Sequence, residues 1–544
     1  MRGRWQHFVG SGLCAVVVVA ACGPSADVTS TSASPVTTEA PAGGSSGPST
    51  SDPPSGDPTT SEDPPSRPEV TVASPPPPNP GPVDVSAFEP APIQWVRYDD
   101  GIDTAVLEVP VDWADPDGPR FELFLVRHKA WEPDERIGSL LVNPGGPGSE
   151  GSFLAFSAPA IYDRELLRRF DIIAWDPRGT GESQPPIDCI DDYDRYFTDV
   201  DSTPDDEAER RRLVDVAKAF ADECIAKNEY LRHVGTNNSA RDMDAIRRAL
   251  GEETVSYFGF SYGSELGATW ATLFPETVRA AVLDGAADPD ADEVESGLQQ
   301  YAGFEAALES FLAWCGGDRA CPFHSAGDAA GEFDRLMVSL DAAPIPAGDP
   351  TRPLVNRDVA TTAVIVAMYD DASWPQLARA LADARDGDGA GLMRLHDSYY
   401  RRRPDGTYDN FLEAFPVISC ADAAERRTVE EIDADSGRYS EVAPRLVPEG
   451  SLGGYTCTFL PPSLDPRIEI TGDGAPTILV IGTTGDPSTP LDSTIRMANA
   501  LDDSRLVVVV ADQHTGYGVN SCVIGAVNDY LVALELPEDG LRCG

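Results

Sequence analysis

A serine stands between two glycines in the segment Gly259-Phe260-Ser261-Tyr262-Gly263. The apolar run before it is typical of a buried strand, and the segment after it has a helical pattern. Such a tight turn leaves no room for a Cβ at either glycine and presents the hydroxyl to a substrate. The same spacing recurs around Ser45, but without a strand or a helix beside it. We therefore predict that Ser261, and not Ser45, is a nucleophile.

A serine hydroxyl needs a base, and histidine is the usual one. In sites of this kind the base follows the serine and the acid along the chain, which leaves His324, His396 and His514 among the six histidines. His514 alone follows a strand-like run, so it should lie at the carboxyl edge of the sheet, where open α/β sheets bind ligands. We predict His514 as the base, with His324 and His396 as alternatives.

The third member should be an acid that orients the imidazole and stabilises its charged form. Asp486 lies in Gly482-Thr-Thr-Gly-Asp-Pro-Ser-Thr-Pro490, directly after a strand-like run. A loop rich in Gly and Pro follows a fixed irregular path, which suits a carboxylate that must be held still. We predict Asp486 as the acid. Asp284, at the end of an earlier strand run, and Asp512, close to His514 in sequence, remain alternatives.

Acyl transfer also needs N–H donors for the developing oxyanion. One donor should be the backbone of Tyr262, the residue after the nucleophile. The other should come from the loop Asn143-Pro-Gly-Gly-Pro-Gly148, where adjacent glycines let an N–H turn into the site. Gly146 is preferred and Gly145 is the alternative. A phosphate-binding loop is not favoured, because no Lys-Ser/Thr pair follows.

Alternating strands and helices must position these residues. The runs that favour buried strands are 121–126, 139–142, 170–175, 254–258, 279–283, 477–481 and 506–510. Helical patterns cover 207–228, 240–250, 264–274, 301–314 and 374–384. Ser239, with Asp242 three residues later, predicts the start of the second of these helices.

This alternation predicts an α/β fold with a mostly parallel sheet covered by helices on both faces. We expect residues 88–284 and 471–544 to form the core. Strand signals fade between them, and residues 285–470 are predicted to be a mainly helical cap inserted over the carboxyl edge of the sheet.

The combined motifs resemble the α/β-hydrolase aminopeptidases, and in particular the secreted bacterial tripeptidyl aminopeptidases that are related to proline iminopeptidases. The resemblance covers roughly residues 90–544. It rests on the loop 143–148, on Trp175-Asp-Pro-Arg-Gly-Thr-Gly-Glu-Ser183, and on the segments around Ser261, Asp486 and His514.

The resemblance implies hydrolysis of peptides from a free N-terminus by a Ser261–His514–Asp486 triad, without a cofactor. It also implies that Asp176 and Arg178 brace a loop near the site. Relatives of this kind bind the substrate amine with carboxylates from the cap or its rim. The candidates here are Glu265, Glu293, Glu295 and Glu305.

The chain has 544 residues, and 90 acidic against 41 basic side chains give it a formal charge of −49. Nucleic-acid binding requires clustered Lys and Arg, so this charge argues against a nucleic-acid partner. Only residues 8–21 form a long uncharged apolar stretch, and a helix that crosses a bilayer needs about 20 such residues. A protein that spans the membrane several times is therefore not expected.

The N-terminus has the features of an export signal. Arg2 and Arg4 precede the apolar stretch, which ends in small residues before Cys22. This resembles a bacterial lipobox, so we predict a lipoprotein signal peptide over 1–21 and lipidation of Cys22. Residues 22–87 are dominated by Ser, Thr, Pro, Gly and acidic residues, which predicts a disordered tether. The expected location is the extracytoplasmic face of the membrane, held by the lipid.

Eight cysteines remain after Cys14 and Cys22, and an even number in an exported chain suggests disulfides. We expect neighbours to pair: Cys189 with Cys224, Cys315 with Cys321, Cys420 with Cys457, and Cys522 with Cys543. Zinc bound by Cys315, Cys321 and His324 is a weaker alternative, because no fourth ligand is evident. No metal is predicted.

These features predict an exported serine aminopeptidase that acts on short peptides through an acyl-enzyme. An esterase or lipase that uses the same triad is the main alternative. A binding scaffold without turnover is a third possibility, which the presence of all three triad residue types argues against. The sequence indicates neither an oligomeric state nor a physiological substrate.

Overall fold

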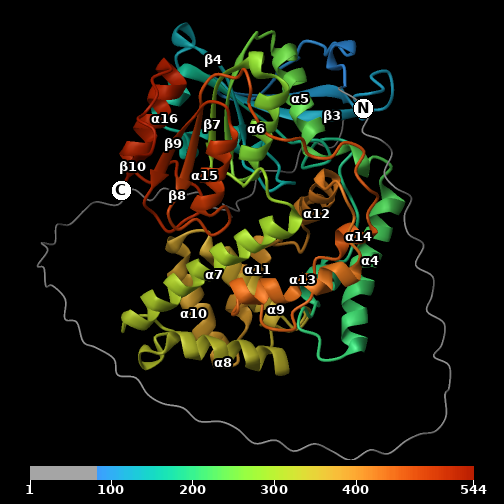
Figure 1. The fold of residues 1–544 in the computed structure, drawn as a ribbon, viewed down its shortest axis with the longest axis vertical. Coiled ribbons are helices and arrows are strands. Elements are labelled where there is room, and N and C mark those ends of the chain that lie inside the picture. Colours follow the sequence, from blue (N-terminus) through green and yellow to red (C-terminus); the bar gives the residue numbers. More distant parts are fainter. Residues whose placement is uncertain (1–82) are drawn as a thin grey trace, which may run out of the picture. The chain divides into compact units, whose positions relative to one another are not determined.

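The computed structural model describes residues 83–544. Ser45, Cys22, the signal peptide and most of the predicted tether lie outside these residues. Figure 1 shows a sheet flanked by helices and, beside it, a group of helices that contains no strand label. This is the predicted fold class.

One sheet contains strands from both ends of the described chain, in the order β1-β2-β3-β5-β4-β6-β7-β8-β9-β10. The pairs from β1 to β5 are antiparallel, and the pairs from β5 to β10 are parallel. The strands are β1 Val96–Asp99, β2 Ile102–Pro110, β3 Arg120–His128, β4 Gly138–Asn143, β5 Phe170–Trp175, β6 Val255–Phe260, β7 Val278–Asp284, β8 Ile478–Thr483, β9 Ser504–Val509 and β10 Leu541–Cys543.

Every residue of β5, β6 and β8 is buried, as expected for strands that are covered on both faces. One apolar cluster joins one face of the sheet to α5, α6 and α15, and a second joins the other face to α1, α2, α3 and α16. These helices are α1 Phe153–Phe156, α2 Ala158–Ile161, α3 Arg164–Arg169, α5 Thr236–Leu250, α6 Tyr262–Leu273, α15 Leu491–Ala500 and α16 Ser521–Ala533.

Helices fill the segment between β7 and β8, where the cap is predicted. They are α7 Glu293–Gly317, α8 Ala329–Ala342, α9 Arg357–Met368, α10 Trp374–Arg385, α11 Ala390–Tyr399, α12 Phe411–Asp422, α13 Val429–Val442 and α14 Thr456–Phe459. The helices α7 to α11 share an apolar core of their own. The long helix α4 Glu207–Lys227 comes from the first part of the chain and packs against α14 (Figure 1).

The predicted start of α5 is wrong. The helix begins at Thr236 instead of Ala240, so Ser239 and Asp242 lie inside it and do not cap it. The buried Asp242 pairs with Arg178, whose Nε is 2.8 Å from Asp242 Oδ2. Asp176 is also fully buried and accepts the N–H groups of Ser152 and Glu182 at 2.9 Å. Asp176 and Arg178 therefore both brace the loop after β5, as the resemblance implied.

All four predicted disulfide pairings are present. They join Cys189 to Cys224, Cys315 to Cys321, Cys420 to Cys457 and Cys522 to Cys543. The last links α16 to β10, at one edge of the sheet. Cys315 and Cys321 are thus bonded to each other, and His324 Nδ1 lies 3.1 Å from the carbonyl oxygen of Cys315.

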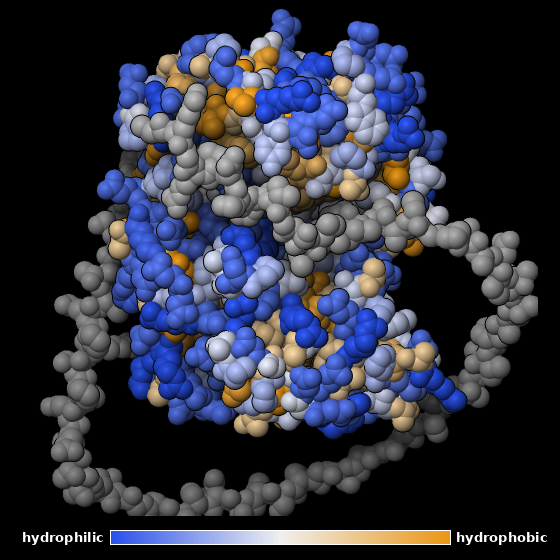
Figure 2. Space-filling model, turned by 180° about the vertical axis from the view of Figure 1, so that it is seen from behind, coloured by the Kyte–Doolittle hydropathy of each residue, from blue (hydrophilic) through white to orange (hydrophobic). Residues whose placement is uncertain are grey.

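Hydrophilic side chains predominate on the face shown in Figure 2, in keeping with the high charge of the chain. Among the helices of residues 83–544, none combines the length and the apolar character that crossing a bilayer requires.

Candidate active site

Ser261 occupies the turn between β6 and α6, with φ 55° and ψ −128°. Positive φ is uncommon and strained for a residue with a Cβ. The flanking glycines are required by close packing. A Cβ on Gly259 would lie 2.2 Å from the carbonyl oxygen of Gly263, and one on Gly263 would lie 2.8 Å from that of Asn143. The turn therefore has the geometry that the sequence motif predicted.

The ends of neighbouring strands connect this turn to the histidine. The N–H of Ser261 donates to the carbonyl oxygen of Asp284, the last residue of β7, at 2.8 Å. The next residue, Gly285, packs so tightly that a Cβ there would be 3.2 Å from His514 Cε1. One short stretch of backbone thus contacts both the nucleophile turn and the imidazole.

Asp486 and His514 form a hydrogen-bonded pair. His514 Nδ1 lies 2.8 Å from Asp486 Oδ1 and 3.0 Å from Oδ2. The other ring nitrogen, Nε2, is buried and has no hydrogen-bond partner among residues 83–544. A base that takes a proton from a serine needs this arrangement, with one nitrogen held by an acid and the other available.

The loop after β8 holds the Asp486 carboxylate in place. Oδ1 accepts the N–H groups of Ser488 and Thr489 at 3.0 and 2.8 Å, and Oδ2 accepts that of Thr515 at 3.0 Å. These bonds satisfy the carboxylate although the residue is only 3% exposed. The rigid Gly- and Pro-containing loop therefore fixes the carboxylate, as its sequence suggested.

The pKa of His514 is raised above its ordinary value of 6.5. Burial alone would lower it, but the charge and the hydrogen bond of Asp486, together with the charge of Asp284, outweigh burial. A catalytic base must be neutral, so activity that depends on His514 should fall as the pH drops below this raised pKa.

The residues that the sequence offered as alternative acids and bases lie outside the Asp486–His514 pair. The Asp284 carboxylate accepts the backbone N–H groups of two residues that follow His514 in the sequence. The Asp512 side chain is exposed. His396 is buried in the cap, with Nε2 3.3 Å from the carbonyl oxygen of Phe197. His324 lies beside a disulfide. None of their side chains forms a hydrogen bond with Ser261, Asp486 or His514 within the described chain.

The loop after β4 lies against the nucleophile turn. A Cβ on Gly145 would be 2.8 Å from Ser261 Cβ and 3.0 Å from the Tyr262 nitrogen. The Gly145 N–H already donates to Asn143 Oδ1 at 2.9 Å. By contrast, the N–H groups of Gly146 and Tyr262 donate to no other group of residues 83–544. This pattern favours Gly146 over Gly145 as the second oxyanion donor.

We expect Gly145→Ala to lower kcat/KM by about 10²–10³-fold, the usual effect of losing an oxyanion donor. The new Cβ would lie 2.6 Å from the carbonyl oxygen of Phe260, so the loop would have to move away from the nucleophile. Gly251→Ala is a matched control, because Gly251 also has positive φ but has no neighbouring atom within 4 Å. Steady-state rates and thermal melting of both variants check this, and equal activity losses would contradict it.

The cap contributes contacts that the sequence did not reveal. The N–H of His514 donates to the carbonyl oxygen of Tyr369 at 2.9 Å, and the two rings meet edge to face at 5.4 Å. Arg401 Nη2 donates to Ser149 Oγ at 2.9 Å, next to the oxyanion loop. Neither Tyr369 nor Arg401 belongs to a recognisable motif, so no signal in the sequence could have identified these long-range contacts.

The candidate amine-binding acids differ in their surroundings. Glu305 accepts the backbone N–H groups of Arg445 and Leu446 inside the cap, and Glu295 is 3.9 Å from Arg438. Glu293 is exposed in the first turn of α7. Glu265, on α6 one turn after Ser261, is the candidate nearest the nucleophile turn in sequence, and it pairs with Arg467 at 2.9 Å.

Asp422 is a further acid that sequence reasoning missed. It accepts Thr236 Oγ1 at 2.6 Å, and Thr236 in turn contacts the hydroxyl of Tyr262, the residue after the nucleophile. Burial and the neighbouring charge of Glu265 raise the pKa of Asp422 to about 7. Two acids and one arginine, Arg467, therefore meet beside the nucleophile turn.

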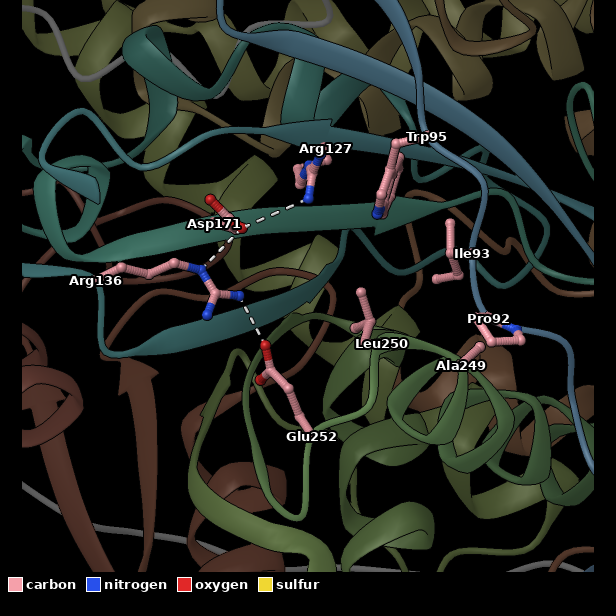
Figure 3. A pocket seen from close by; sticks show the side chains of 9 residues that line it. All are labelled: Pro92, Ile93, Trp95, Arg127, Arg136, Asp171, Ala249, Leu250 and Glu252. Carbon is pink, nitrogen blue, oxygen red and sulfur yellow. Dashed lines mark hydrogen bonds and ion pairs between the residues drawn. The ribbon is translucent and has the colours of Figure 1, made fainter. Parts of the chain in front are cut away.

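A pocket of roughly 560 Å³ lies near the amino ends of β5 and β6 (Figure 3). Its charged residues neutralise one another: Arg136 Nε is 2.9 Å from Asp171, Arg136 Nη2 is 2.7 Å from Glu252, and Arg127 is 3.9 Å from Asp171. Asp171 is near the start of β5, and Glu252 precedes β6, whereas Ser261 follows the end of β6. This pocket is therefore separate from the nucleophile turn.

Known proteins are similar to this chain over most of its length. Residues 138–521 match the family model described as alpha/beta hydrolase fold. Serine protease Hip1 of Mycobacterium tuberculosis (strain ATCC 25618 / H37Rv) is 33% identical over 487 residues, which cover 83% of this chain and 91% of the relative. Carboxylesterase B of the same strain is 36% identical over 457 residues, covering 81% of this chain and 86% of the relative.

A third relative is the tripeptidyl aminopeptidase of Streptomyces lividans. It is 29% identical over 459 residues, covering 81% of this chain and 83% of the relative. The relatives thus carry the names of two peptidases and one esterase, and each match extends over most of both chains.

Proposed function

Because this chain belongs to the α/β-hydrolase family and is a serine hydrolase, we propose that it removes short peptides from substrates with a free N-terminus. The observation that carries the proposal is the Asp486–His514 pair, whose Nε2 has no partner among residues 83–544. The backbone at the end of β7 contacts both this imidazole and the Ser261 turn. Peptidase names among the relatives support the substrate class.

In the proposed mechanism, Ser261 Oγ attacks the scissile carbonyl carbon and His514 Nε2 takes the hydroxyl proton. Asp486 holds Nδ1 protonated and stabilises the imidazolium. The N–H groups of Tyr262 and Gly146 bind the oxyanion. His514 then protonates the leaving amine and becomes neutral again. It next takes a proton from the water that attacks the acyl carbon, and returns that proton to Ser261 Oγ as the acid product leaves. This chemistry requires no cofactor.

The acids beside the nucleophile turn support a preference for a free amine. Glu265 and Asp422 share a single arginine, so the cluster has an excess of negative charge when both are ionised. A substrate ammonium would neutralise this excess. We propose Glu265 as its binding residue, because it lies one turn after Ser261 on α6.

We expect a tripeptide amide with a free N-terminus to be cleaved about 10- to 100-fold faster, as kcat/KM, than its N-acetylated form. A hydrogen bond to a charged group contributes about 1.5–3 kcal/mol, which corresponds to this ratio. Glu265→Gln should reduce the ratio, whereas Glu295→Gln, at a more exposed acid, should preserve it. Equal rates for the free and acetylated peptides would reject the aminopeptidase proposal.

An esterase is the second candidate, because one relative is named carboxylesterase B. The same triad can cleave esters, so measuring short acyl esters beside the peptides separates the two functions. Much faster turnover of esters, together with no effect of acetylation, would favour the esterase.

We also propose export and anchoring through a lipid on Cys22. The four disulfides support an oxidising location. Cys22 itself lies outside the described residues. Fractionation of cells that express the wild type or Cys22→Ser tests this, since only the wild type should be retained in the membrane fraction.

A further inference from the structure

Asp284 is a fully buried acid that the proposed mechanism does not use. It is the last residue of β7, next to both the nucleophile turn and the histidine loop. Its carboxylate forms no hydrogen bond with His514. It instead accepts the N–H groups of Gly516 and Tyr517, each at 2.7 Å. These are the second and third residues after the base.

The same residue also contacts the nucleophile turn, through its backbone. The carbonyl oxygen of Asp284 accepts the N–H of Ser261 at 2.8 Å. Asp284 is therefore hydrogen-bonded to the turn that carries the nucleophile and to the loop that carries the base. Movement of Asp284 would change the separation of these two segments.

A neutral side chain could not accept both of these backbone N–H groups. Both carboxylate oxygens accept a backbone N–H at a short distance, which is typical of charge-assisted hydrogen bonds. An asparagine could accept only one of these donors and would turn its NH₂ group toward the other. Ionising a buried acid is costly, and burial raises the pKa of Asp284 to about 7. Burial therefore opposes the ionised form, on which both of these short bonds depend.

The charged groups around Asp284 come from several loops. Asp486, after β8, opposes its ionisation, and His514, after β9, favours it. The buried hydroxyl of Tyr517 lies close enough to be affected by the Asp284 charge. His514 thus has two acids near it: Asp486, which is bonded to the ring, and Asp284, which is bonded to the backbone beyond it.

We propose that Asp284 is a positioning residue that holds the His514 loop against Ser261 and places a negative charge beside that loop. This proposal rests on the proposed roles of Ser261 and His514. It does not depend on whether the substrate is a peptide or an ester.

The test measures the second-order rate at which a fluorophosphonate probe inactivates full-length Asp284→Asn, as a function of pH. This probe reports on the nucleophile and the base without any peptide-binding step. We expect the rate at its optimum to fall by about 10²-fold, the usual effect of misplacing a catalytic group. The acid limb should move to lower pH, because an imidazolium is less stable without the nearby negative charge.

Asp358→Asn is the matched control. Asp358 also accepts a backbone N–H at 2.7 Å, from Ser202, but it lies in the cap on α9. We expect it to change thermal stability and leave both the rate and the acid limb unchanged. If Asp284→Asn does not fold, Asp284→Ser replaces it, since its smaller side chain leaves space for a water that can accept the second N–H.

An unchanged inactivation rate in the folded Asp284 variant would overturn the proposal. A lower rate with an unmoved acid limb would overturn the second part of the proposal, because the charge of Asp284 would then have no effect on His514. If peptides fail as substrates while the probe results follow expectation, the proposed peptidase function fails and the role of Asp284 stands.

Discussion

Ser261→Ala is expected to lower kcat by roughly 10⁴–10⁶-fold, the largest effect of any single substitution in this chain. The substitution removes Oγ and retains the Cβ, so the strained turn and its bond to Asp284 should be preserved. Without Oγ no acyl-enzyme can form, and only binding and the oxyanion donors would still accelerate the reaction. Steady-state turnover and labelling by a fluorophosphonate probe measure the loss.

Ser264→Ala provides the control for Ser261→Ala. Ser264 lies in the first turn of the same helix, and its hydroxyl accepts a long 3.3 Å bond from Ala287. It should keep both labelling and turnover. Near-normal turnover of Ser261→Ala would show that the nucleophile lies elsewhere.

Asp486→Asn is expected to lower kcat by about 10⁴-fold with little change in KM. Asp486 accepts three backbone N–H groups and the imidazole, and an amide cannot accept at both of its terminal atoms. The NH₂ group would also favour the wrong tautomer of His514, in which Nε2 carries the proton and cannot act as the base.

The exposed Asp512 supplies the control for this substitution, because it lies close to His514 in sequence but forms no bond with it. Asp512→Asn should retain activity. If Asp486→Asn also retained activity within about tenfold, another acid would have to serve His514. Asp284 would then be the first candidate, and the double variant would identify it.

The sequence predicted the buried strands well, because their apolar runs are continuous. The prediction for β5, residues 170–175, matches its bounds, and those for β6 and β7 differ by one or two residues at each end. The strands β1, β2 and β10 were missed. All four residues of β1 are exposed, and β2 alternates between buried and partly exposed residues. Such strands have no long apolar run.

Predictions from local sequence patterns were wrong where a residue distant in the sequence determined the structure. The Ser239–Asp242 spacing resembled a helix start, but Asp242 is buried because Arg178, from a loop 64 residues away, pairs with it. Asp284 and Asp486 both follow strands, so their sequence contexts could not separate them with certainty. Asp486 accepts a hydrogen bond from the imidazole, whereas Asp284 accepts N–H groups of the backbone after His514. Only the three-dimensional structure separates these two roles.

The cap is attached to both halves of the catalytic centre. Asp370 forms a β-bridge with Gln513 next to the Tyr369–His514 bond, and Arg401 reaches the loop beside Gly146. Swinging the insertion outward about either attachment would break the other. A shortened enzyme without residues 285–470 would lose both supports, so it would not serve as a minimal catalyst. Exchanging caps between relatives would likewise require partners at both positions to be transplanted together.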